Sequence, residues 1–344
     1  MFRKCFIVTS LLLSLSVRAD GFESILALTS GNSDPTPVST TVLAGLDVPA
    51  IADPGRGALQ SAAVRPVAFS SVDAQAFSHA SDLHLSSASA LVIDQDKGQL
   101  MYGKNIHAIQ PIASITKLMT AIVVLDAKLK LDQKIRISEL DVDLLKGTRS
   151  RLRVGTLLTR RELLKLALMA SENRAASALG RVYPGGADAF IVAMNRKAVA
   201  LGMRETRFMD SSGLNPGNVS TAQDLAILVN ASYQYPLIRH FSTSESYEIA
   251  SVATVKRHRA RAIEFRNSNG LVRAGSWDIG LSKTGYISEA GRCLVMQATI
   301  GARPVIIVLL DSWGKMTRLG DANRVKRWIE GLPPAGRGYR NTIG

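Results

Sequence analysis

Residues 111–126 read PIASITKLMTAIVVLD, and this stretch decides the fold because it predicts a helix with almost no polar face. Such a helix is expected to be buried at the centre of a domain. Ser114 lies at the N-cap or in the first turn, and Lys117 follows three residues later on the same helix face. A hydroxyl and an amine in this arrangement indicate a nucleophile and its base. A capped core helix with a chance lysine is the competing interpretation.

The N-terminal quarter of the chain is expected to lie outside the folded domain. Residues 1–19 have a basic start, a short apolar run and small residues spaced as a cleavage site, which predict a secretory signal peptide. Residues 20–86 are rich in Ser, Ala, Thr, Val and Pro, and predict a disordered leader. The folded domain is expected over residues 87–331, followed by a basic tail over residues 332–344.

Charge and cysteine content restrict the environment of the mature protein. The formal charge is +14 for the 344 residues and +11 without the three basic residues of the signal peptide. In an exported protein this balance favours an anionic surface or polymer, such as a cell wall, over nucleic acid. Cys5 leaves with the signal peptide, so Cys293 has no intramolecular partner and is expected to be a buried, inert thiol.

Beyond residue 87, the pattern predicts strands, then helices, then strands and a last helix. The predicted strands are Ala90–Asp94, Gln99–Gly103, Tyr247–Ser251, Trp277–Gly285, Arg292–Ile300 and Arg303–Asp311. The predicted helices after the central one are Leu163–Ser171, Ala187–Leu201, a segment from Ser220 that stops before Pro236, and Thr317–Glu330. This order implies one α/β (α+β) unit, in which an antiparallel sheet is assembled from both chain ends around a helical insertion.

Three short motifs follow one another along the chain. They are Ser114-Ile115-Thr116-Lys117, Ser171-Glu172-Asn173 and Lys283-Thr284-Gly285. Residues 312–315 also match the first motif and residues 30–32 the second, but these matches lie in a C-terminal loop and in the leader. Taken alone, Ser171 would be interpreted as a helix cap and Lys283 as a solvated strand lysine. The order and placement of all three motifs favour an enzyme with an active serine.

These motifs, in this order, resemble those of the penicillin-binding DD-peptidases and serine β-lactamases. The resemblance covers about residues 87–331, through PIASITKLMTA, LALMASENRAA, YPGGADAFIVAMN, FMDSSGLNPGNVSTAQDL and SKTGYISEAGRCLVM. It is nearest to the low-molecular-mass D-alanyl-D-alanine endopeptidases of the penicillin-binding protein 7 type. It implies an antiparallel sheet flanked by helices, a helical subdomain and an active site between them, in a periplasmic enzyme that acts on peptidoglycan.

The chemistry of Ser114 and Lys117 agrees with this resemblance. Ser114 must lose a proton to attack an amide, and Lys117 can take that proton only when neutral. Burial, the helix N-terminus and a second cation, Lys283, are expected to lower the pKa of Lys117. The resemblance assigns the oxyanion-hole donors to the backbone N–H groups of Ser114 and Tyr286, and gives Ser171 the relay of a proton to the leaving amine.

The remaining motif residues are expected to bind the substrate. Asn173 would hold the substrate amide, while Lys283 and Thr284 would bind its carboxylate or carbonyl. Gly285 leaves the strand edge bare, so that an extended peptide can pair with it.

The sequence therefore predicts a cofactor-free serine endopeptidase that cleaves D-alanyl-diaminopimelate cross-links through an acyl-enzyme. β-Lactam antibiotics are the expected covalent inhibitors, and other murein hydrolases are candidate partners. A DD-carboxypeptidase has the same chemistry, and the motifs do not separate the two. Overall resemblance and the lack of a C-terminal amphipathic anchor favour the endopeptidase.

Other functions have less support. A β-lactamase needs fast deacylation, and no additional glutamate is placed for it after Ser171. A non-catalytic wall-binding or penicillin-sensing module does not need a nucleophile with two amines. No metal is expected, because the histidines show no metal-binding spacing; they are His79, His84, His107, His240 and His258.

Overall fold

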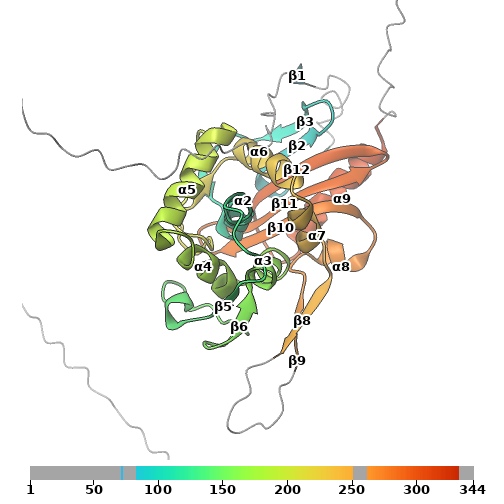
Figure 1. The fold of residues 1–344 in the computed structure, drawn as a ribbon. Coiled ribbons are helices and arrows are strands. Elements are labelled where there is room, and N and C mark those ends of the chain that lie inside the picture. Colours follow the sequence, from blue (N-terminus) through green and yellow to red (C-terminus); the bar gives the residue numbers. More distant parts are fainter. Residues whose placement is uncertain (1–70, 73–82, 251–261, 333–344) are drawn as a thin grey trace, which may run out of the picture. The chain divides into compact units, whose positions relative to one another are not determined.

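The computed structural model describes most of the chain beyond the predicted leader (Figure 1). The described residues are 71–72, 83–250 and 262–332, all within one compact unit, Leu59–Gly344. The predicted signal peptide, most of the leader and most of the tail lie outside them. Leu83 and Leu85 are already buried, so packing begins slightly before the expected boundary at residue 87.

A six-stranded sheet with the order β1-β3-β2-β12-β11-β10 organises the described residues. Its strands are β1 (Ser71–Val72), β2 (Ser87–Asp94), β3 (Gln99–Lys104), β10 (Asp278–Ile287), β11 (Gly291–Ile300) and β12 (Arg303–Ser312). Neighbouring strands are antiparallel except for β1 with β3. Because β2 pairs with β12, the sheet joins both ends of the domain, which confirms the predicted topology.

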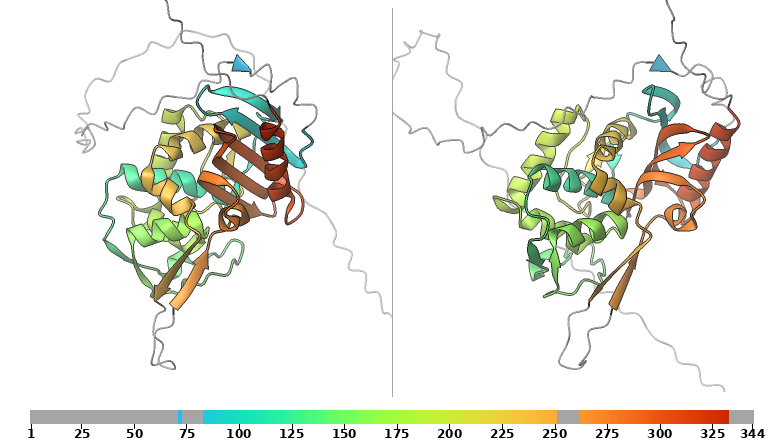
Figure 2. Two further views of the ribbon diagram at one scale, coloured as in Figure 1. Left: turned by 90° about the vertical axis from the view of Figure 1, so that its right-hand side faces the viewer. Right: turned by 45° about the vertical axis from the view of Figure 1, so that its right-hand side comes forward.

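The two faces of the sheet pack against different sets of helices. Along β12, Ile306, Val308 and Leu310 enter the larger core, whereas the alternating Val305, Ile307 and Leu309 enter the smaller core. The smaller core is completed by α9 (Thr317–Glu330), and most of the other helices lie on the opposite side of the sheet (Figure 2).

The larger core surrounds the predicted central helix. The helices here are the 3-10 helix η2 (Ala113–Thr116), α2 (Lys117–Asp126), α3 (Arg160–Met169), α4 (Asn173–Arg181), α5 (Gly186–Leu201), α6 (Ala222–Tyr233) and α7 (Pro236–Ser242). Every residue of α2 from Lys117 to Val124 is buried, as its sequence predicts. The helix α3 begins three residues before the predicted start at Leu163, with a capping box formed by Thr159 and Glu162. No helix of the described residues is long and apolar enough to cross a membrane.

Several elements were not expected from the sequence. Pro236 was interpreted as a stop, but it begins α7, because a proline is well accommodated in the first turn of a helix. The helices α4 and α8 (Gly270–Ala274) are short and were not predicted. The predicted strand Tyr247–Ser251 does not join the main sheet: β8 (Ser246–Ala250) pairs with β9 (Ala262–Arg266), and residue 251 lies outside the described residues.

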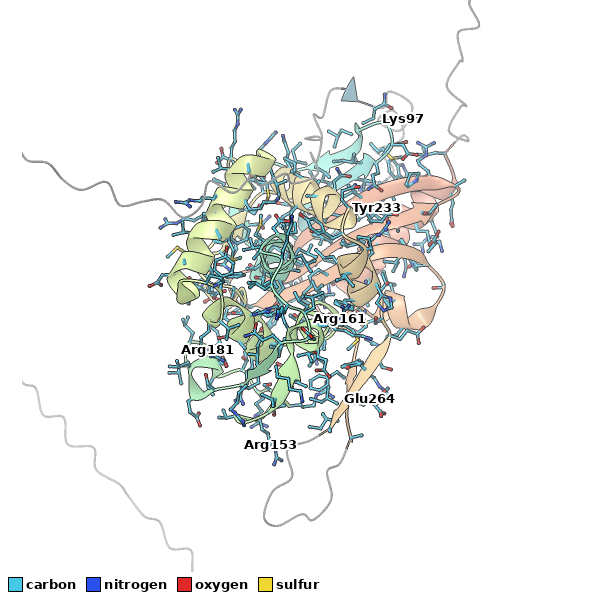
Figure 3. The ribbon with its side chains drawn as sticks, viewed as in Figure 1. Lys97, Arg153, Arg161, Arg181, Tyr233 and Glu264 are labelled. Carbon is cyan, nitrogen blue, oxygen red and sulfur yellow. The ribbon has the colours of Figure 1, made fainter. Side chains whose placement is uncertain are left out.

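Two further small sheets belong to this part of the chain. The strand β4 (Gln110–Pro111) pairs with β7 (Val219–Ser220), and β5 (Lys134–Arg136) pairs with β6 (Leu157–Thr159). Arg153, Arg161 and Arg181 are labelled on the helical part around α3, α4 and these strands in Figure 3, and the first two are exposed. Part of the positive charge of the chain is therefore carried by this region.

Asp321 of α9 holds the start of β2 in place. Its buried carboxylate accepts hydrogen bonds from the backbone N–H groups of Ser86 (3.1 Å) and Ser87 (2.8 Å) and from the Ser87 hydroxyl (2.6 Å). Asp321→Ala would leave these donors unpaired, so we expect the free energy of unfolding in urea to fall by about 2–4 kcal/mol. Asp96→Ala, at an exposed turn, is the control and should change it by less than about 0.5 kcal/mol. Equal effects would contradict this role.

Candidate active site

A cavity of about 220 Å³ brings the three sequence motifs together. It is lined by Ser114, Ser171, Asn173, Thr284, Gly285, Tyr286 and Arg318. Lys117 and Lys283 lie beneath this lining, with exposed fractions of 0% and 1%. Among the described residues that line the cavity, Arg318 alone does not belong to the set predicted from the sequence.

Lys117 is hydrogen-bonded to the proposed nucleophile. Its Nζ donates to Ser114 Oγ at 2.8 Å, to Asn173 Oδ1 at 2.8 Å and to the Ser212 carbonyl oxygen at 2.6 Å. Of the two predicted positions, the N-cap and the first turn, the structure has the second: Ser114 lies in η2, the 3-10 turn that leads directly into α2. A 3-10 helix has three residues per turn, so Ser114 still projects over Lys117.

Burial lowers the pKa of Lys117 to about 7, against the opposing influence of the carboxylates of Asp210 and Glu172. A lysine with this pKa is neutral in a large fraction of molecules near neutral pH. The pKa of Lys283 is also lowered well below its usual value, first by burial and then by the nearby cations Lys117 and Arg318. Lys117 thus lowers the pKa of Lys283, whereas burial lowers the pKa of Lys117 without the expected contribution from Lys283.

Lys283 and Ser171 form a second pair. Lys283 Nζ donates to Ser171 Oγ at 2.8 Å and to the Thr284 carbonyl oxygen at 2.7 Å. The buried position of Lys283 excludes the solvated strand lysine. Ser171 is not the N-cap of α4, which is Glu172, but it follows Ala170, the C-cap of α3. Its φ of +60° is the left-handed conformation that commonly ends a helix, and it directs the Ser171 hydroxyl to Lys283.

Gly285 allows β10 to approach the nucleophile closely. A Cβ atom at this position would lie 3.0 Å from the Ile112 carbonyl oxygen and 3.2 Å from the Ser114 nitrogen. A side chain would therefore press on the backbone of η2. The close approach brings Ser114 and Tyr286, whose N–H groups are the predicted oxyanion donors, to the same cavity.

A loop over residues 210–218 fixes one of the acceptors of Lys117. The Asp210 carboxylate accepts from the backbone N–H of Ser212 at 2.7 Å, and the Ser212 carbonyl faces Lys117. Asn218 Nδ2 donates to the Thr116 hydroxyl at 3.0 Å, which ties the loop to η2. This loop belongs to none of the three motifs and had no predicted role, although its Asp, Asn, Gly and Pro residues are typical of a tightly hydrogen-bonded turn.

Arg318 also lines the cavity but belongs to none of the three motifs. It lies on α9, and its Nη1 donates to the carbonyl oxygens of Gly285 (2.9 Å) and Cys293 (3.1 Å). The guanidinium thus adds a cation to the cavity from the far end of the chain. No local pattern marks it, because its role depends on how α9 packs on the sheet.

The left-handed backbone at Ser171 has a measurable cost. Ser171→Gly removes the steric strain and Ser171→Ala retains it, so we expect the glycine variant to be about 1 kcal/mol more stable to urea. The same pair at Ser177, within α4, is the control and should show the opposite order by about 0.5–1 kcal/mol. If alanine were also the more stable choice at position 171, the backbone there would not be strained.

Comparisons with known proteins agree with this geometry. The family described as D-alanyl-D-alanine carboxypeptidase, peptidase S11, matches residues 75–314. A D-alanyl-D-alanine endopeptidase of Pseudomonas aeruginosa is 49% identical over 261 residues, covering 74% of this chain and 83% of the relative. One of Escherichia coli is 46% identical over 251 residues, covering 73% and 79%. The crystal structure of the Streptomyces K15 DD-transpeptidase superposes with a TM-score of 0.65 at 29% identity, covering 71% of this chain and 97% of that chain.

The antiparallel sheet and helical subdomain are shared with this solved DD-transpeptidase, and the family match extends over more than half of the sequence. The chain belongs to the S11 family of serine D-alanyl-D-alanine peptidases.

Proposed function

We propose that this chain is a periplasmic endopeptidase that cleaves D-alanyl-diaminopimelate cross-links of peptidoglycan through an acyl-enzyme on Ser114. The observation that carries the proposal is the contact of 2.8 Å between Ser114 Oγ and the fully buried Lys117. Residues 87–331 form the catalytic domain, and residues 1–19 direct export. The endopeptidase names of relatives at 46–49% identity support this substrate over a terminal D-alanine.

Acylation begins with Ser114 and neutral Lys117. The Ser114 hydroxyl turns to donate to Lys117 Nζ and transfers its proton as Oγ attacks the carbonyl carbon of D-alanine. The carbonyl oxygen becomes negative and is stabilised by the N–H groups of Ser114 and Tyr286. The C–N bond then breaks, and the leaving amine takes a proton from the Ser171 hydroxyl, which regains one from the ammonium form of Lys283. Water then attacks the ester carbonyl and gives a proton through Ser171 back to Lys283. The ester C–O bond breaks, Ser114 Oγ takes back the proton held by Lys117, and the peptide leaves as a carboxylic acid.

One end of the cavity binds the carboxylate of the leaving residue, which follows the scissile bond. Lys283, Thr284 and Arg318 gather there, and an arriving carboxylate would favour the charged form of Lys283. The acyl part of the peptide pairs with β10 beyond Gly285, and Asn173 holds its amide. A β-lactam presents a carbonyl and a carboxylate in a similar relation, which makes it a covalent inhibitor.

A D-alanyl-D-alanine carboxypeptidase is the second candidate. The family description favours it, because the residues matched carry that name. The two activities share every group described above and differ only in what is attached to the leaving amine. They are therefore separated by substrate and not by mechanism.

The pH dependence of acylation tests the role of Lys117. Only its neutral form accepts a proton, and its pKa is about 7, so the rate should rise with pH through about 7 and then level off. The measurement is the rate of labelling by a fluorescent penicillin between about pH 5 and about pH 9. Lys117→Arg keeps a cation that does not release its proton and should be slower by at least about 100-fold. A flat profile through pH 7 would exclude Lys117 as the base.

The substrate is tested with purified muropeptides followed by mass spectrometry. We expect the mature protein to convert cross-linked dimers to monomers. Loss of one alanine from pentapeptide monomers, with dimers untouched, would establish the carboxypeptidase instead. Ser114→Ala is the control: it should abolish both this activity and covalent labelling by a fluorescent penicillin while the circular dichroism spectrum is unchanged. Undiminished labelling of this variant would refute the acyl-enzyme at Ser114.

A further inference from the structure

A turn from the helical subdomain reaches across one end of the cavity. The Asp143 carboxylate organises it, accepting from the backbone N–H groups of Lys146 (2.9 Å) and Thr148 (2.9 Å) and from the Thr148 hydroxyl (2.6 Å). The turn contacts both walls of the cavity. Thr148 Oγ1 accepts from Asn173 Nδ2 at 3.1 Å, and Lys146 Nζ forms an ion pair with Glu289.

Glu289 lies in the hairpin that joins β10 to β11, three residues beyond Tyr286, which lines the cavity on the side of the sheet. The Ser288 hydroxyl donates to its second carboxylate oxygen at 2.7 Å, which orients it. The side chains of Lys146 and Glu289 keep 22% and 39% of their exposure. Partly exposed ion pairs contribute little to stability. This pair is therefore better placed to meet a ligand than to hold the fold together.

The direction of the bound peptide brings it to this pair. Lys283 and Arg318 mark the end of the cavity where the carboxylate of the leaving residue binds, and the oxyanion donor of Tyr286 marks the reacting carbonyl. The part of the peptide that precedes the D-alanine must then continue past Tyr286 toward Glu289, antiparallel to β10. The side chain of the preceding residue is thus carried to the rim formed by Lys146 and Glu289.

We propose that Lys146 and Glu289 form a subsite for a zwitterionic side chain on the residue before the D-alanine. Lys146 binds its carboxylate and Glu289 binds its ammonium group, and the ion pair between the two residues opens to admit them. This inference rests on the proposed function, in which that residue is diaminopimelate, whose side chain ends in both groups. A neutral side chain offers neither contact and leaves the resident ion pair closed.

The replacement of the Lys146–Glu289 ion pair by contacts with the ligand explains why such a site would select a zwitterionic side chain. The zwitterion replaces one ion pair with two, so the opened site keeps every charge paired. A side chain with a single charge would leave Lys146 or Glu289 without its partner, which disfavours binding. Asp143 accepts a hydrogen bond from the Lys146 backbone, and Ser288 donates one to the Glu289 carboxylate. The two residues are therefore in place before the substrate arrives, and only the contact between their side chains opens.

Two penicillins that differ only in their side chain test this subsite. One carries a zwitterionic α-aminoadipyl group and the other a neutral phenoxyacetyl group. We expect Lys146→Met and Glu289→Gln each to slow acylation by the zwitterionic compound by about tenfold and to change acylation by the neutral one by less than about twofold. Lys97→Met, at the exposed turn between β2 and β3 labelled in Figure 3, is the control and should change neither rate.

The outcomes separate this inference from the proposed function. An equal loss with both penicillins would mean that the pair only maintains the shape of the cavity, and no loss would mean that it does not contact the acyl side chain. Either result overturns the subsite. Retained selectivity toward the zwitterionic penicillin, in a protein that cleaves no muropeptide dimer, would support the subsite and refute the endopeptidase. Failure of both penicillins to acylate the wild-type chain would overturn both.

Discussion

Burial of the Lys117 amine is the constraint on which the rest of the site depends. An amine without water must find protein acceptors, and Lys117 has three, on η2, on α4 and on the loop after α5. These three segments are far apart in the sequence. The three hydrogen bonds of Lys117 Nζ therefore fix Ser114, Asn173 and Ser212 relative to one another. The same lack of water lowers the pKa of the lysine, so packing and reactivity have one physical cause.

The second lysine extends this arrangement to the sheet. Lys283 is also buried, and its neighbours Lys117 and Arg318 disfavour its charged form. A carboxylate bound in this cavity would favour the charged form of Lys283, because it offsets the repulsion from these neighbours. Binding energy from the carboxylate is thus linked to the charge state of the groups that surround the reacting carbonyl.

Much of this fold and site follows from the sequence because the deciding signals are local. The apolar run after Lys117, the capping box at Thr159 and the apolar run along β12 each specify an element without help from distant residues. The pairing of Lys283 with Ser171 could be expected only through the order of the motifs.

Other features depend on tertiary packing and leave no local trace. Arg318 lies on an amphipathic helix where a basic residue is ordinary, and its importance appears only when α9 docks on the sheet. The sequence of the loop from Asp210 to Asn218 is that of an ordinary polar turn. Only the folded structure shows that its Ser212 carbonyl accepts a hydrogen bond from Lys117. The close packing of Gly213, where a Cβ atom would lie 2.0 Å from the Ala113 carbonyl oxygen, is another contact that no local pattern encodes.

The pairing of β2 with β12 also has a consequence for biogenesis. The nucleophile is made early in synthesis, whereas its partners on β10 and α9 emerge near the end. A chain that is still being made has Ser114 without Lys283 or Arg318 beside it. The cavity is therefore complete only when β10 and α9 have packed on the rest of the domain, and a partly folded chain lacks one wall of the site.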